Sequence, residues 1–196
     1  MAAHYENQLQ RGVRDTYAAM LKGFAAVEKG VGIPTVDIRE ASEVYTRLRL
    51  DHPELFYLTG FHLRMMPGAE RSEAVADYLF DKSKILSHRQ AISARVQRLA
   101  REAAKLDEMG KIKWLHDFIC ENVRYDKLKK PYSHEVIGPL TQGVGVCEGI
   151  AKSVKLLADE LRIPCLALCL LHKLKCPYHK IARALSLQTE TGHLSH

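Results

Sequence analysis

Apolar side chains recur at the spacing of one helix face in three parts of the first half of the chain. The pattern predicts helices over 5–30, around 41–48 and over 83–105, the first ending at a glycine. The stretch GVGIPTVD between the first two helices is interpreted as a linker. Pro53 excludes helix continuation, and the apolar positions around Gly60 indicate short extended segments near 54–64.

The second half predicts two more helices and a loop between them. One helix begins near Met109 and fades at RYDKLKKPYSHE, and the segment 125–145 is a loop that contains proline and glycine. After the loop, apolar residues at helical spacing define a buried helix face, which consists of Ile150, Val154, Leu157 and Leu161. Pro164 ends this helix, and CLALCLL, from Cys165 to Leu171, indicates a buried strand.

These elements predict an α+β fold. Residues 1–105 form a mostly helical N-terminal region, with the short extended segments near 54–64. Residues 106–171 form a second, partial domain, and 172–196 form a basic tail of different character.

Composition and charge narrow the class of protein. The 196 residues are 46% hydrophobic and 27% charged, which is typical of a globular chain. The longest apolar run is too short to span a bilayer, and the start has no secretory pattern, so we expect a cytoplasmic protein without a membrane partner. The odd number of five cysteines favours reduced thiols.

The net charge of +6 arises largely near the end, where Glu190 is the only acid after Glu160. A small basic cluster, formed by Lys127, Lys129 and Lys130, has no accompanying motif for reading nucleic acid. We therefore interpret it as a solvated surface and predict no nucleic-acid partner.

Cys147 is the candidate catalytic residue. In TQGVGVCEGIAKSVKLLADELRIPC it lies between glycines where the loop becomes a helix. Unpaired N–H groups and the dipole at a helix start stabilise a thiolate, and they could hold the oxyanion formed when a thiolate attacks an acyl carbon. Small neighbouring residues would let a substrate approach the backbone. The alternative is an ordinary buried cysteine at a helix end.

The phrases WLHDFICENVRYDKL, YSHEVIGPL and GVGVCEGIAKSVKLLADELRIPC, in this order over about 112–168, resemble the transglutaminase-like superfamily of bacterial type. The resemblance implies a papain-like core, with Cys147 as nucleophile and no metal or organic cofactor. It implies a histidine base in an H-A-W-N phrase on a following strand, and an aspartate on the next strand to orient that histidine. Protein or peptide substrates would be expected.

The histidine and aspartate motifs of that family are not found. After Leu171 the chain contains no tryptophan and no aspartate. His193 is the best-spaced candidate base in the tail, ahead of His172 and His179, whereas His134 lies on the loop before Cys147. We therefore expect a core that stops before those motifs, because the gene product is either truncated or frameshifted. Its activity should be weak or absent.

A zinc site near the end of the chain is a further hypothesis. The possible zinc ligands are Cys165, Cys169, His172, Cys176 and His179. Their spacing matches no common zinc motif, so no metal site is predicted.

The predicted function is thiol-dependent acyl transfer, or hydrolysis of amide or peptide bonds. The alternative is a non-catalytic binding or scaffold protein derived from the same fold. The sequence leaves the substrate and the oligomeric state open.

Overall fold

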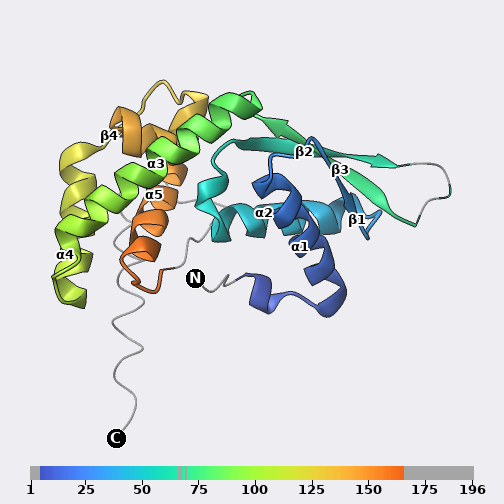
Figure 1. The fold of residues 1–196 in the computed structure, drawn as a ribbon, viewed down its shortest axis with the longest axis horizontal. Helices are drawn as coiled ribbons and strands as arrows, with labels where there is room; N and C mark the ends of the chain where they lie inside the picture. Colours follow the sequence, from blue (N-terminus) through green and yellow to red (C-terminus); the bar gives the residue numbers. More distant parts are fainter. Residues whose placement is uncertain (1–4, 66–67, 69, 166–196) are drawn as a thin grey trace, which may run out of the picture. The chain divides into compact units, whose positions relative to one another are not determined.

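The computed structural model describes residues 5–65, 68 and 70–165 (Figure 1). It divides the chain into two compact units, with the division between Arg89 and Gln90 inside helix α3 (Lys82–Ala103). The strand predicted for CLALCLL lies outside the described residues from Leu166 onward, and so does the basic tail 172–196.

The first unit combines a sheet with helices. It contains η1 (Glu6–Gln8), α1 (Arg11–Ala25), β1 (Gly30–Ile33), α2 (Ile38–Asp51), η2 (Pro53–Leu55), β2 (Leu58–Met65) and β3 (Ser72–Tyr78). The strands form an antiparallel sheet in the order β1-β3-β2, and α1 packs against both α2 and β1 (Figure 1). The core of this unit includes Tyr17, Phe24, Leu48, Tyr57 and Ala76.

The interpretation of GVGIPTVD as a linker was wrong, because its first four residues form β1. Glycines hide the strand in the sequence, yet Val31 and Ile33 are buried and the whole segment pairs with β3. The contact with α1 requires a glycine: a Cβ at Gly23 would lie 2.2 Å from Cγ2 of Val31. The sequence also did not predict β3, so the first unit is less helical than expected.

The second unit contains the rest of α3, then α4 (Glu108–Asn122), β4 (Arg124–Tyr125), η3 (Pro131–His134), a π-helical turn η4 (Gly138–Gln142), β5 (Val144–Gly145) and α5 (Cys147–Glu160). Helices α3, α4 and α5 confirm the predicted helices in these positions. Three of the four residues predicted for the buried face of α5 are buried, namely Val154, Leu157 and Leu161. The α+β class is thus confirmed.

The segment 125–145 is more ordered than an open loop. Its ends form β4 and β5, which pair in parallel with Tyr125 opposite Gly145. Between them, the side chains of Val136, Ile137 and Leu140 are buried. The guanidinium of Arg95, on α3, donates a hydrogen bond of 2.7 Å to the carbonyl of Leu140. None of the helices in the described part of the chain is long and apolar enough to cross a membrane.

Candidate functional site

Cys147 is the first residue of α5, as the sequence predicted. The preceding residue, Val146, has extended backbone angles (φ −92°, ψ 173°) and provides no side-chain hydrogen bond to the helix end. The first N–H groups of an α-helix have no acceptor within the helix and carry partial positive charge. The Cys147 side chain is partly exposed, and its thiol lies at the same helix end as these N–H groups.

The loop before α5 packs closely on this helix end. The Val146 N–H donates a 3.0 Å hydrogen bond to the carbonyl of Ser133. A Cβ at Gly149 would lie 2.2 Å from the same carbonyl oxygen, and a Cβ at Gly145 would lie 2.6 Å from Cγ of Pro139. The expectation that these glycines admit a substrate was therefore wrong for both positions, because the protein's own loop occupies the space.

Asp126 organises the part of the loop that follows β4. Its N–H donates to the carbonyl of Gly145, and its carboxylate accepts hydrogen bonds from the Leu128 N–H (2.9 Å), the Lys130 N–H (3.0 Å) and the Ser133 hydroxyl. The Ser133 hydroxyl and, to a lesser extent, these N–H groups and the charge of Lys130 hold the pKa of Asp126 below its ordinary value. The ionised carboxylate therefore fixes the loop.

A buried ion pair involves Lys152, five residues after Cys147 on α5. The ammonium of Lys152 lies 2.7 Å and 2.8 Å from the two carboxylate oxygens of Glu135, and both side chains are buried. Lys152 also contacts Glu148 at 2.8 Å, and Glu148 lies 3.5 Å from Nδ1 of His134. The network joins α5 to the segment at the end of η3.

The sequence did not identify this network. The spacing of Glu148 and Lys152 by four residues is visible in the chain and is typical of an exposed helix pair. The burial of Lys152 and its pairing with Glu135 depend on how the loop folds over α5, which no local pattern records.

Of the candidate bases, only His134 lies among the described residues. His134 lies on η3, is about half exposed and faces Glu148. Within the described part of the chain, no side chain forms a hydrogen bond with the sulfur of Cys147. His172, His179 and His193 lie outside the described residues.

The other described cysteines differ from Cys147. Cys120 is exposed on α4, with its sulfur 3.6 Å from Nε2 of His116. Burial raises the pKa of the Cys165 thiol, with a lowering by Lys155 and a raising by Asp159 as smaller effects. Among the described residues no group of three metal-ligating side chains occurs, and the remaining members of the Cys165–His179 cluster lie outside them.

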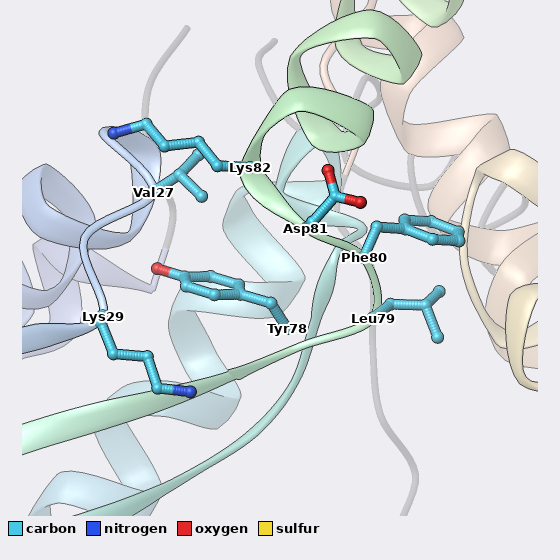
Figure 2. A pocket seen from close by; sticks show the side chains of 7 residues that line it. All are labelled: Val27, Lys29, Tyr78, Leu79, Phe80, Asp81 and Lys82. Atoms are coloured by element: carbon cyan, nitrogen blue, oxygen red, sulfur yellow. The ribbon is translucent and has the colours of Figure 1, made fainter.

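A surface hollow in the first unit, about 520 Å³ in volume, is lined by Val27, Lys29 and the run from Tyr78 to Lys82. Figure 2 shows the amino groups of Lys29 and Lys82 extending in different directions. They do not converge on one point, and Asp81 adds a carboxylate to the lining. We therefore assign no anion site there, and the surroundings of Cys147 remain the candidate functional site.

No family model matches the sequence, and no curated protein matches it.

Proposed function

We propose that this chain is a transglutaminase-like cysteine enzyme with a papain-like core, in which Cys147 is the nucleophile. Its reaction is acyl transfer from, or hydrolysis of, amide or peptide bonds in protein or peptide substrates in the cytoplasm. The observation that carries the proposal is the position of Cys147 as the partly exposed first residue of a 14-residue helix. The resemblance of the surrounding phrases to that superfamily supports it.

The chemistry follows from this position. The Cys147 thiolate attacks the amide carbon, and the resulting oxyanion is stabilised by N–H groups at the start of α5. The C–N bond then breaks, the amine leaves with a proton, and a thioester remains. Attack by a second amine or by water releases the acyl group and regenerates the thiol. This reaction needs no metal or organic cofactor.

The proton transfers need a base close to the Cys147 sulfur. His193 is our candidate for this role, on the spacing of the chain. His134 is the described histidine on the loop that packs against α5, and its Nδ1 lies 3.5 Å from a carboxylate oxygen of Glu148. Without a histidine near the sulfur, thiolate formation and proton donation to the leaving amine are both slow, and activity is weak.

The second candidate function is a non-catalytic binding or scaffold protein of the same fold. The observation that favours it is that the Cys147 sulfur has no hydrogen bond within the part of the chain that the structure describes. In that case the rigid loop and the helix end would bind a partner without cleaving it.

The rate of alkylation by iodoacetamide at about pH 6, with each cysteine followed by peptide mass spectrometry, separates the two functions. Cys120 is the exposed reference, and Cys165, which is partly exposed and whose thiol pKa is raised by burial, is the second reference. Labelling of Cys147 much faster than Cys120 supports the enzyme. Labelling no faster than Cys120 supports the binding protein.

An activity measurement completes this test. Incorporation of a fluorescent primary amine into a glutamine-containing protein reports acyl transfer, and release of ammonia reports hydrolysis. Both should disappear in Cys147→Ala and persist in Cys120→Ala. In an active protein, His193→Ala should lower the rate and the alkylation of Cys147 together. Equal rates in the parent and Cys147→Ala would exclude Cys147 as the nucleophile.

A further inference from the structure

The loop at 124–132 exposes a large apolar side chain among positive charges. Leu128 at its tip is 76% exposed, the highest value among the large hydrophobic residues described. The residues Arg124, Lys127, Lys129 and Lys130 surround it in the sequence RYDKLKKPY. We call residues 124–132 the basic loop.

The one acid of the basic loop is engaged with the loop itself. The carboxylate of Asp126 accepts hydrogen bonds from the Leu128 and Lys130 N–H groups and from Ser133. Its charge is therefore directed mainly at the loop backbone and Ser133, while the four basic residues of the loop are exposed. The surface of the basic loop is positive and is complementary to carboxylates.

Hydrogen bonds to the Asp126 carboxylate restrain the backbone of the basic loop. Lys129 has φ +51°, a left-handed conformation that is unfavourable for residues other than glycine and that often marks a functional segment. The ammonium of Lys130 lies 5.6 Å from the centre of the Tyr132 ring, which restrains that side chain. A preorganised loop loses little entropy when it binds a partner.

The basic loop is attached directly to the start of α5. Tyr125 pairs with Gly145, two residues before Cys147, and the Asp126 N–H donates to the Gly145 carbonyl. At the other end, the Ser133 carbonyl accepts a hydrogen bond from Val146. Both ends of the basic loop therefore lie beside the residues that lead into Cys147.

We propose that the basic loop docks an acidic segment of the protein substrate of Cys147, with carboxylates paired to Lys127, Lys129 and Lys130 and an apolar side chain packed on Leu128. This inference rests on the proposed function of Cys147. Leu128 favours a protein over a nucleic acid, since phosphates offer no apolar partner for a leucine. Attachment of the loop beside Cys147 favours a protein over a lipid surface.

The test measures binding by the full chain carrying Cys147→Ser, so that docking is separated from turnover. The probe is a fluorescein-labelled peptide that contains glutamine, leucine and several glutamates, read by fluorescence anisotropy. A matched peptide carries glutamine in place of each glutamate. The acidic peptide should bind more tightly than the neutral one, and added salt should weaken its binding.

Variants of the basic loop locate the contact. Lys127→Gln, Lys129→Gly and Lys130→Gln together should weaken binding of the acidic peptide about tenfold, since three exposed ion pairs are lost. Lys129→Gly suits the left-handed backbone at that position. The control removes three lysines of the first unit, as Lys29→Gln, Lys82→Gln and Lys84→Gln, and should leave binding unchanged. Leu128→Ser tests the apolar contact alone.

The outcomes separate this inference from the proposed function. Equal binding of the acidic and neutral peptides, or equal loss in the loop and control variants, overturns the docking inference even where Cys147 is reactive. Loop-dependent binding of duplex DNA or phosphatidylserine vesicles in place of the acidic peptide overturns it too. Loop-dependent peptide binding with an unreactive Cys147 supports docking and contradicts the enzyme. If the triple variant loses native Trp114 fluorescence, Leu128→Ser and Lys129→Gly decide the question.

Discussion

The ammonium of Lys152 and the carboxylate of Glu135 form a buried ion pair, with nitrogen–oxygen distances of 2.7 Å and 2.8 Å. Lys152 lies on α5, whereas Glu135 directly follows η3, so the pair joins the helix of Cys147 to the loop before it. A buried ion pair gains little stability over apolar residues, but removal of one partner leaves an uncompensated charge. The pair therefore ties loop and helix into one arrangement.

Lys152→Met should lower the free energy of unfolding by about 3–5 kcal/mol, because Glu135 is then left buried without its cation. Urea unfolding followed by the fluorescence of Trp114, the single tryptophan, measures this in the second unit. The double variant with Glu135→Leu should recover most of the loss. As a control, Lys113→Met removes a pair with Asp117 on the surface of α4 and should change the free energy of unfolding far less, because water screens that pair. A small effect of Lys152→Met would show that water reaches the pair.

Gly149→Ala should destabilise the protein by about 1–3 kcal/mol, the range typical of overpacking. The added Cβ would lie 2.2 Å from the backbone oxygen of Ser133, which cannot rotate away as a side chain would. Gly12→Ala, near the start of α1, is the matched control because its Cβ would meet nothing within 4 Å. The control should stabilise its helix by up to about 1 kcal/mol. Unfolding followed by circular dichroism compares the two, and equal effects would argue against the close contact at Gly149.

The helices were predictable because their signal is local. Leu115 on α4 and Leu157 on α5 recur with their apolar neighbours at helical spacing, and both are buried as expected. The strand β3 has the sequence SEAVADY, whose alanines and acids have low strand propensity. Its conformation is determined by pairing with β2, the preceding strand, and with β1, which is distant in sequence.

The candidate site was predictable only in part. The position of Cys147 at a helix start follows from the glycine-rich phrase and from the apolar spacing that comes after it. The buried role of Lys152 does not, since periodicity assigns a lysine to solvent and its carboxylate partner lies on a separate segment. The use of Gly149 for loop packing is hidden for the same reason.

Asp126→Asn should lower the free energy of unfolding at neutral pH. The difference from the parent protein should become smaller in acid. Hydrogen bonds from Ser133 and the loop N–H groups lower the pKa of Asp126 below its ordinary value of 3.8. A lowered carboxyl pKa adds stability that is fully present above 3.8 and is lost as the pH falls through the lower, folded value. Urea midpoints of both proteins, read by Trp114 fluorescence over a pH series, measure this difference.

Asp81 and Asp117 also have lowered pKa values, but both are present in the parent and in the variant. Their pH-dependent contributions therefore cancel in the difference between the two free energies of unfolding. A difference between the two proteins that stays constant through the acid range would contradict the role of the Asp126 charge. It would leave only a steric effect of the substitution on the loop.

Tyr17→Phe should lower the free energy of unfolding by about 1.5–3 kcal/mol, the range for hydrogen bonds to charged groups. The Tyr17 hydroxyl donates a 3.0 Å hydrogen bond to the buried carboxylate of Asp51, which also accepts from the Tyr5 and Glu6 N–H groups. Burial and, to a smaller extent, Asp51 raise the pKa of Tyr17 far above its usual range, so the hydroxyl remains a donor at neutral pH.

Tyr57→Phe is the matched control for the Tyr17 substitution. Its hydroxyl donates over the same 3.0 Å to the neutral carbonyl of Phe24, and burial raises the pKa of Tyr57 to about 12. Its removal should cost only about 1 kcal/mol. Hydrogen exchange of the α1 and α2 amides measures both variants within the first unit. A Tyr17→Phe effect no larger than that of Tyr57→Phe would mean that the two N–H donors satisfy Asp51 without the hydroxyl.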